Sequence, residues 1–353
     1  MNPYHIFKVV PLSVLQMLAR FAAWVIIKIP SLSIMRTIQI NMALITYTLS
    51  EQQKRALTKD IIYHQCLTSI ESIKSWAMPP EWSIAQIRDV HNKDILLEGL
   101  ANPNGMLAIV PHLGTWEMMN AWLNQFGAPT IMYKPVDGKF ANEFILQGRA
   151  RLNATLVPTD GSGVKAVFKT LKQGGFSIVL PDHVPEPSGG VVVPFFGIKT
   201  LTSTLASKLA SKTKCALVGL SCIRRTDGRG FDIYCYKLND PSLYDRNAEV
   251  ATHALNQAME RMITDNYSHY MWGYRRFKRI PNLGNPYRKD KETLAAFIQS
   301  HHSNVSSRSD SNINDSVRNN NVKIDNVKID NVKSNNVKID STVKSDNTKL
   351  DNH

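Results

Sequence analysis

A histidine and a carboxylate stand five positions apart where a strand is expected to lead into a helix. In IVPHLGTWEMMN (109–120), an apolar run precedes His112, and Gly114 with Thr115 begins a helical segment whose first turn holds Glu117. Open α/β sheets bind ligands at the carboxyl ends of their strands. A carboxylate that holds a histidine fixes its tautomer and leaves the other ring nitrogen free as a base. We therefore predict that His112 is a general base and that Glu117 orients it.

The chemistry predicted for this motif is acyl transfer without a covalent enzyme intermediate. The motif holds no serine or cysteine nucleophile, so the base takes a proton from a substrate hydroxyl, which then attacks a carbonyl. Two alternatives stay open: Glu117 also favours the helix macrodipole, and His112 also suits a loop. A zinc site fits less well, because the two residues lack the one-face spacing of helical metal motifs. We expect neither a metal nor a cofactor.

The elements around the motif alternate between strands and helices. The strand candidates are short, apolar and bounded by turn-forming residues: 106–110, 129–133, 154–157, 177–180, 191–194, 215–223 and 231–236. Helix-length segments lie between several of them or close the domain: 115–125, 139–152, 161–172, 201–212 and 247–267. Helices are also expected over 34–90, and RTDGRGF (225–231) is expected to form a hairpin turn. This order predicts an α/β fold with a largely parallel sheet flanked by helices.

Both ends of the chain differ from this body, which we place at residues 31–300. Residues 1–30 contain the apolar run 9–27, interrupted by Arg20; Ser13, Gln16 and Arg20 fall on one helical side. We expect a membrane-anchor or interfacial helix there, with a buried helix of a soluble domain as the alternative. Residues 301–353 repeat the unit NVKID and contain too few apolar residues to form a core, so we expect a disordered tail.

Charge and cysteine content narrow the classes of function. The 353 residues carry a formal charge of +13, nearly all of it outside the tail, which favours an anionic partner. Two basic runs stand out: Lys208, Lys212 and Lys214, and Arg275, Arg276, Lys278 and Arg279. Each run is either a binding surface or a solvated basic face, and in the second run Trp272 and Phe277 alternate with the charges and could pack it against the domain. The four cysteines have neither CxxC nor zinc-type spacing, which argues against a disulfide framework and fits a reducing compartment.

Six ordered blocks of the sequence resemble the lipid A biosynthesis late acyltransferases, the lauroyl and myristoyl transferase family. The blocks are IVPHLGTWE, IMYKPVDGKF, GRARLNATLVP, GGFSIVLPDH, VVVPFFGIKT and YMWGYRRFKRIP, and they span positions 109 to 281. The resemblance implies a glycerol-phosphate-acyltransferase-like domain at the cytoplasmic face of the inner membrane. It also implies acyl transfer from acyl carrier protein to a 3-hydroxyacyl chain of an anionic, Kdo-bearing lipid A precursor.

The resemblance assigns roles to individual positions. His112 matches the family's base and Glu117 its acidic partner, while Arg149 matches an arginine that holds a phosphate or the developing oxyanion. The remaining matches are weaker. Lys134, a candidate contact for a substrate phosphate, stands where the family has arginine and lacks its bidentate fork. Asp182 matches an acidic position of the family and is a candidate substrate contact, although His183 follows it where most relatives have glutamine; an aspartate here also suits a helix cap or a turn. Phe196 in PFFG suits a wall beside an acyl chain, although aromatic pairs are often core residues.

Two other classes of function stay open at this point. The same chemistry could serve another acceptor, such as a lysophospholipid or a glycolipid. A non-enzymatic basic protein that binds membranes or nucleic acid is the third hypothesis, but no nucleic-acid-binding motif is present and the positive residues are dispersed. We therefore expect no nucleic-acid partner.

Overall fold

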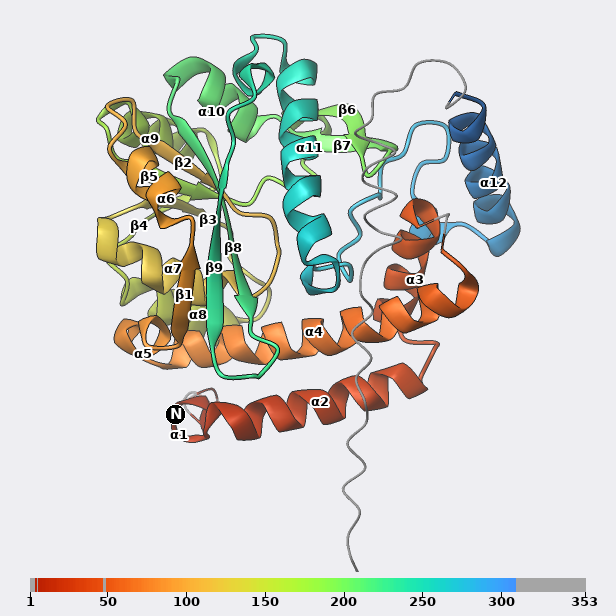
Figure 1. The fold of residues 1–353 in the computed structure, drawn as a ribbon, viewed down its shortest axis with the longest axis horizontal. Helices are drawn as coiled ribbons and strands as arrows, with labels where there is room; N and C mark the ends of the chain where they lie inside the picture. Colours follow the sequence, from red (N-terminus) through yellow and green to blue (C-terminus); the bar gives the residue numbers. More distant parts are fainter. Residues whose placement is uncertain (1–3, 5, 47–48, 309–353) are drawn as a thin grey trace, which may run out of the picture.

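A central sheet with helices on both faces forms the body of the protein (Figure 1). The computed structural model describes residues 4, 6–46 and 49–308. Seven strands form the central sheet in the order β1-β9-β8-β2-β5-β3-β4, and β6 and β7 form a separate hairpin. The strands are β1 (Ile87–His91), β2 (Met106–Ile109), β3 (Thr130–Tyr133), β4 (Thr155–Pro158), β5 (Phe176–Val179), β6 (Gly190–Phe195), β7 (Ile198–Ser203), β8 (Ala216–Arg224) and β9 (Phe231–Lys237). All pairings in the large sheet are parallel except β8 with β9, which confirms the largely parallel α/β prediction.

The helices cover the two faces of the sheet and extend beyond it. They are α1 (Ile6–Val9), α2 (Leu12–Lys28), α3 (Ser33–Ile45), α4 (Glu51–Ala77), α5 (Pro80–Ile84), α6 (Lys93–Leu100), α7 (Trp116–Leu123), α8 (Lys139–Ala150), α9 (Gly161–Lys172), α10 (Leu205–Thr213), α11 (Ala248–Asp265) and α12 (Lys291–Arg308). Alternate side chains of β2 belong to different cores: Leu107 and Ile109 to one, Met106 and Ala108 to the other. The central strand is thus buried on both faces, as parallel sheets require.

Two strands were not predicted, and each has a local reason. β1 lies within the region expected to be helical; its sequence IRDVH is too polar to read as a buried strand, and it pairs with β9 at the edge of the sheet. β7 takes the first residues of the helix expected over 201–212, so that helix begins only at Leu205. The turn between β6 and β7 has positive φ at Phe196 (49°) and Gly197 (77°), as in the tight hairpin turns that match strand twist. The hairpin expected at 225–231 is confirmed.

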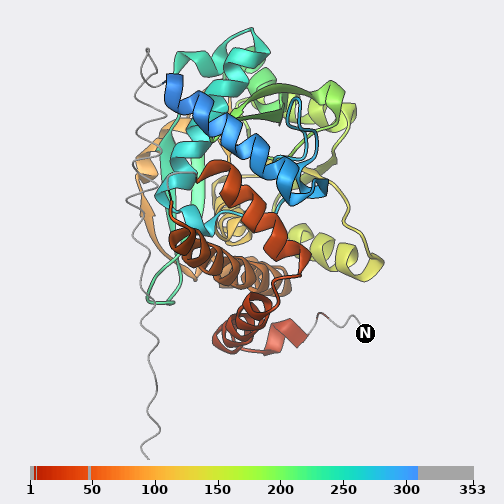
Figure 2. The ribbon, with the colours of Figure 1, turned by 90° about the vertical axis from the view of Figure 1, so that its right-hand side faces the viewer.

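The N-terminal helix α2 lies along the long helix α4 at the edge of the body (Figures 1 and 2). Its inner face buries Leu15, Gln16, Ala19 and Ala23. Of the predicted polar stripe only Gln16 faces the protein, whereas Ser13 and Arg20 are exposed. Its outer face exposes Val14, Met17, Leu18, Phe21 and Trp24. In the described part of the chain, no single helix has the length and apolar character of a membrane span; α2 and α3, bent by 75°, meet that test only as a pair.

The last helix of the described chain extends beyond residue 301, where the disordered tail was expected to begin. Helix α12 continues to Arg308, so residues 301–308, expected to be disordered, are helical. Residues 309–353, which hold the NVKID repeats, lie outside the described residues.

A buried ion pair joins α2, α4 and the strand β8 to the turn that follows His112. Glu71 in α4 is fully buried and accepts hydrogen bonds from Arg224 at the end of β8, one of them 2.8 Å from Arg224 Nη2 to Glu71 Oε2. The same carboxylate accepts from Gln16 Nε2 (2.8 Å) and from Thr115 Oγ1 (2.8 Å). Arg224 Nη1 also donates to His64 Nδ1 (3.0 Å), which must therefore be unprotonated. Burial, followed by the charge of Arg224, lowers the pKa of His64 to about 3.

Removal of the Glu71 charge is expected to destabilise the protein strongly. Glu71→Gln leaves the guanidinium of Arg224 buried without its counterion, and loss of one partner of a buried pair costs about 3–5 kcal/mol. The matched control is Glu51→Gln in the same helix, where the exposed pair with Lys54 contributes less than about 1 kcal/mol. The free energy of unfolding from urea titration measures both variants. Similar small losses in the two variants would contradict this account.

Candidate active site

Two neighbouring parallel strands bring His112 and Asp182 together. The register of β2 and β5 pairs Ile109 with Val179, and His112 and Asp182 each lie three residues further along their own chain segment. The backbone N–H of His112 donates to Asp182 Oδ2 (2.9 Å), and the His112 carbonyl accepts from Met271 N–H (2.9 Å). The site thus lies at the carboxyl edge of the sheet, where ligands bind in open α/β folds.

The Asp182 carboxylate holds the His112 ring directly. Asp182 Oδ1 lies 2.8 Å from His112 Nδ1, and Oδ2 also accepts from Tyr270 Oη at 2.9 Å. Burial alone would raise the pKa of Asp182, but its interactions with the ring and backbone of His112 outweigh burial and hold that pKa well below its usual value. An ionised carboxylate only accepts hydrogen bonds, so Nδ1 carries the proton. Nε2 of His112 is therefore the basic nitrogen.

The structure places the Glu117 carboxylate beside Arg149 and not beside the His112 ring, so its orienting role stays a prediction. The Glu117 carboxylate, in the first turn of α7, accepts from Arg149 Nη2 at 2.5 Å, and both side chains are largely buried. Arg149 comes from the last turn of α8 and also lies over the Tyr133 ring. A buried guanidinium needs an anion beside it, and the Glu117 carboxylate is that anion for Arg149. The carboxylate beside His112 is the one of Asp182. Asp182, predicted as a substrate contact, is the hydrogen-bond partner of the His112 ring.

A second imidazole lies on the His112 ring. The His183 ring stacks on His112 with centroids 4.4 Å apart and planes 13° apart, and the Trp116 edge packs against His112 from another direction at 4.9 Å. His112 is nearly buried, whereas His183 is exposed. Partial desolvation and the neighbouring His112 lower the pKa of His183 to about 4. His183 is therefore neutral near pH 7 and adds no positive charge beside the base.

The turn between His112 and α7 is fixed by contacts with three other segments. Gly114 has φ of 65°, and a Cβ there would lie 2.0 Å from the Cys222 carbonyl oxygen, so only glycine fits. Gly114 N–H donates to the His269 carbonyl (3.0 Å), and Thr115 N–H donates to the Cys222 carbonyl (2.8 Å). The Thr115 hydroxyl reaches Glu71. The ion pair of Glu71 with Arg224 thus supports the turn that follows His112.

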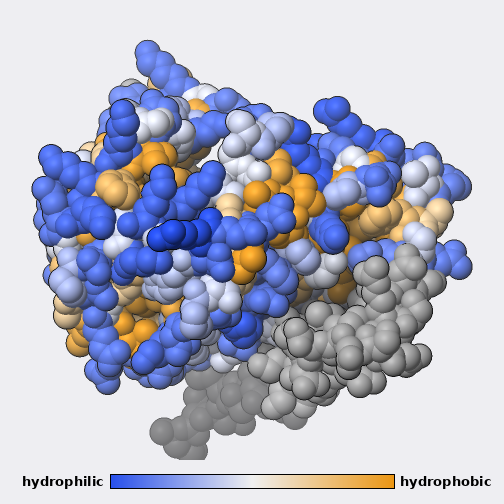
Figure 3. All heavy atoms as spheres, turned by 90° about the horizontal axis from the view of Figure 1, so that it is seen from above, coloured by the Kyte–Doolittle hydropathy of each residue, from blue (hydrophilic) through white to orange (hydrophobic). Residues whose placement is uncertain are grey.

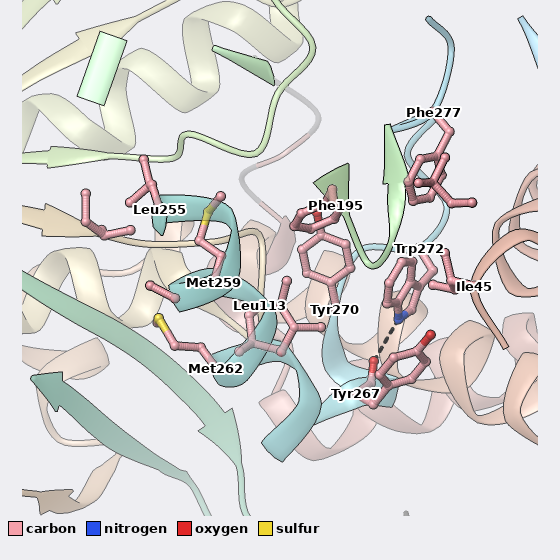
Figure 4. Close-up of a cluster of buried hydrophobic side chains, with 14 of the residues drawn as sticks. Ile45, Leu113, Phe195, Leu255, Met259, Met262, Tyr267, Tyr270, Trp272 and Phe277 are labelled. Atoms are coloured by element: carbon pink, nitrogen blue, oxygen red, sulfur yellow. Dashed lines mark hydrogen bonds between the residues drawn. The ribbon is translucent and has the colours of Figure 1, made fainter. Parts of the chain in front are cut away.

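An aromatic cluster supports Tyr270, the third member of the site (Figure 4). Tyr270 packs edge-on against Trp272 with centroids 4.7 Å apart, and Trp272 Nε1 donates to the Tyr267 carbonyl at 2.8 Å. All three side chains are buried. Tyr270 begins the sixth sequence block, YMWGYRRFKRIP, yet its contact with Asp182 was not predicted, because no local pattern connects residues 88 positions apart.

The other predicted site residues lie away from the His112 ring or have structural contacts. Lys134 follows β3 and is exposed, so its grip on a phosphate stays a prediction. Phe196 packs edge-on against Trp272 (5.5 Å), and its backbone N–H donates to Glu260 (2.8 Å). Its place in an acyl-chain wall also stays a prediction. Arg149 already pairs with Glu117, and any contact with substrate remains to be tested.

One residue of the basic runs is not at the surface. Arg276 is fully buried; it donates to the Leu201 carbonyl (2.9 Å) and to Thr202 Oγ1 (2.6 Å), and it lies over the Phe195 ring. Burial lowers its pKa. The solvated-face and binding-surface interpretations are both wrong for this arginine, whereas the neighbouring Arg275 and Arg279 are exposed.

The family of the chain is shown by comparison with known sequences. The model of the bacterial lipid A biosynthesis acyltransferases matches residues 4–279. The chain belongs to this family. It is 28% identical over 246 residues to the lipid A biosynthesis lauroyltransferase of Escherichia coli K12, covering 68% of this chain and 78% of the relative. It is 24% identical over 254 residues to the lipid A biosynthesis acyltransferase of Haemophilus influenzae, covering 70% and 78%.

A more distant group of relatives carries a different name. The phosphatidylinositol mannoside acyltransferase of Mycolicibacterium smegmatis is 27% identical over 186 residues, covering 52% of this chain and 58% of the relative. The relatives named here are all acyltransferases by name, and the acceptors in those names differ.

Asp182→Asn is expected to lower the rate of acyl transfer by about 10³- to 10⁴-fold, as loss of the orienting carboxylate does in comparable triads. The amide keeps the shape of the side chain but favours the wrong tautomer of His112. Steady-state transfer rates and the unfolding midpoint measure the effect, with Asp160→Asn, an exposed helix cap, as the matched control. A fully active Asp182→Asn beside an inactive Glu117→Gln would return the orienting role to Glu117.

Proposed function

We propose that this protein transfers a fatty acyl chain from an acyl carrier protein thioester to a hydroxyl group of a Kdo-bearing lipid A precursor. The observation that carries the proposal is the buried pair of His112 and Asp182 in a member of this family. The pair supplies a base with a defined free nitrogen, which is what direct acylation of a hydroxyl requires.

The reaction follows from the two ring nitrogens of His112. Nε2 removes the proton from the acceptor hydroxyl as its oxygen attacks the thioester carbonyl. Asp182, hydrogen-bonded at Nδ1, stabilises the imidazolium that forms. Collapse of the tetrahedral intermediate breaks the carbon–sulfur bond, and Nε2 returns the proton to the leaving thiolate. An ester and a free thiol result, and His112 is again neutral.

The cysteines do not suit a mechanism with an acyl-enzyme intermediate. Burial raises the pKa of the Cys235 thiol to about 12, and it also raises the pKa values of the Cys66, Cys215 and Cys222 thiols. The thiolate is the nucleophilic form of cysteine. A raised pKa therefore supports direct transfer to the acceptor.

A second candidate acceptor is another membrane glycolipid. The relatives named phosphatidylinositol mannoside acyltransferases favour it. It keeps the same base, the same partner and the same thioester donor, and it changes only the molecule that supplies the hydroxyl. An assay that offers several acceptors separates the two candidates.

The proposed reaction is tested by mass spectrometry of purified protein in detergent. The assay offers a Kdo-bearing lipid A precursor, a lysophospholipid and a glycolipid, each with acyl carrier protein thioesters of several chain lengths. We expect the lipid A precursor to gain the mass of one acyl group, and we expect His112→Ala to lower the rate by at least about 10³-fold.

The matched control for the assay is His253→Ala, a histidine of α11, which is expected to keep the rate of the wild-type protein. Acylation of the glycolipid alone would shift the proposal to the second acceptor. Inert acceptors with every donor would contradict the proposed function.

We further propose that the protein works at the cytoplasmic face of the inner membrane and that α2 is its membrane contact. The exposed face of α2 carries Phe21 and Trp24, 63% and 57% exposed, and Lys28 lies near the Trp24 ring at its end. Aromatic and aliphatic side chains flanked by lysine are typical of helices that lie in the plane of a membrane surface. Gln16 and Ala19 on the other face stay packed on α4.

Phe21→Glu with Trp24→Glu is expected to reduce binding to anionic phospholipid vesicles by at least about tenfold, because two apolar side chains no longer enter the lipid. The matched control is Leu97→Glu with Val250→Glu, two exposed apolar residues of α6 and α11. Co-sedimentation with vesicles measures both variants. Binding of the α2 variant at the level of the wild-type protein would contradict the assignment of α2.

A further inference from the structure

A groove with a basic rim and an apolar floor lies between the β6–β7 hairpin and the segment 278–288. Its volume is about 560 Å³. Leu201 and Ile280, both buried, and the half-exposed Val192 supply apolar lining, and Lys278, Arg279 and Arg288 supply positive charge. None of the described residues that line this hairpin groove is acidic. Its composition suits a ligand that is anionic at its edge and apolar at its centre.

The walls of the hairpin groove are held in place by buried contacts. Arg276, two residues before the segment, donates to the Leu201 carbonyl and the Thr202 hydroxyl in β7. The Arg279 carbonyl accepts from Leu201 N–H (3.3 Å) and from the Thr200 hydroxyl (3.2 Å). Because these bonds use backbone atoms and a buried arginine, the charged ends of Lys278 and Arg279 are left for a partner. Glu186 lies 4.0 Å from Arg279 and is 90% exposed, so it holds that guanidinium only weakly.

Two chain segments connect the hairpin groove with the active site. Pro187, which lines the groove, follows His183 by four residues, and at most about 14 Å of extended chain separates their Cα atoms. Lys278 follows Tyr270 along the other segment, and Val184 N–H binds Tyr274 Oη (3.0 Å) to join the two segments. The groove thus begins within about 14 Å of His183, which stacks on the His112 ring, and a flexible prosthetic arm of a docked partner can span such a distance.

The groove and the exposed face of α2 lie on different sides of the molecule. In Figures 1 and 2 the β6–β7 hairpin lies in the upper part of the body, and α2 lies at its lower edge. Figure 3 views the molecule from the side away from α2 and shows a largely hydrophilic face that contains apolar patches. With α2 at the membrane, this side faces water, which favours a soluble anionic partner over a lipid.

We propose that the hairpin groove docks the acidic carrier protein that delivers the acyl thioester. This inference rests on the proposed function, in which the donor is an acyl carrier protein thioester. The rim residues Lys278, Arg279 and Arg288 pair with carboxylates of the carrier, and the apolar floor receives the apolar side chains between those carboxylates. Charge complementarity of this kind governs association rate and specificity.

The test is the charge-reversed variant Lys278→Glu/Arg279→Glu/Arg288→Glu, with the corresponding triple glutamine variant as a milder form. The matched control is Lys165→Glu/Lys169→Glu/Lys172→Glu, three exposed lysines of α9 with the same change in net charge. Two donors carry the same acyl chain: the carrier protein thioester and a pantetheine thioester that lacks the protein. Surface plasmon resonance with the carrier protein measures binding independently of activity.

We expect the groove variants to raise KM for the carrier protein thioester by at least about tenfold and to lose carrier binding in the binding measurement. The salt dependence that charge pairing gives to the KM of the wild-type protein is expected to be lost as well. Rates with the pantetheine thioester and KM for the acceptor are expected to stay within about twofold of the wild-type values, as is every value for the control variant.

Four results would overturn the docking proposal. Equal effects in the groove and control variants would show that only net charge matters. A raised KM for the acceptor alone would assign the groove to the phosphates of the lipid. A wild-type protein that neither binds the carrier nor uses its thioester would overturn both this inference and the proposed donor, whereas unaffected groove variants of a carrier-dependent enzyme would overturn the docking site alone.

Discussion

The hydrogen bond between the Asp182 carboxylate and His112 Nδ1 is the interaction on which the site depends. A buried carboxylate is stable only with enough donors, and Asp182 receives the ring and backbone N–H groups of His112 and the hydroxyl of Tyr270. These bonds join three parts of the fold: the end of β2, which leads to His112, the turn after β5, which holds Asp182, and the segment after α11, which holds Tyr270. The geometry of the base is therefore a property of the assembled domain.

A second set of buried charges, Glu71 and Arg224, connects the active site with the N-terminal helix. Glu71 links Arg224 of β8 with Thr115 beside the base and with Gln16 of α2. Buried ion pairs contribute little net stability compared with apolar replacements, but they are strongly destabilising when one partner is lost. The helix whose outer face we assign to the membrane is thus connected, through one carboxylate, to the turn that carries His112. The N-terminal helix and the active site belong to one structural unit.

Much of the fold could be predicted from patterns within single segments. The hydrophobic strands of the sheet and helix α9 were found because apolar periodicity and turn residues are local signals. β1 and β7 were not predicted because their polar residues interrupt the apolar pattern that identifies a strand. They form strands only through pairing with β9 and β6. Propensity of this kind depends on neighbours that the sequence does not identify.

The site was predicted in part, for the same reason. His112 could be singled out from its place after an apolar strand, but its partner could not, because Glu117 is near in sequence and Asp182 is near in space. The missing information was the register of β2 and β5, which places residues 112 and 182 at equal distances beyond a paired position. Arg276 shows the same limit: a run of basic residues predicts a surface, and only the packing of Phe195 and β7 shows that one of them is buried.

The central claim is that Asp182, and not Glu117, fixes the protonation of His112. Nitrogen NMR of protein labelled at histidine tests it most directly, by reporting which ring nitrogen of His112 carries the proton at neutral pH. This account predicts a proton on Nδ1 and an unprotonated Nε2, both unchanged in Glu117→Gln. A proton on Nε2, or a tautomer that changes when Glu117 is replaced, would contradict it.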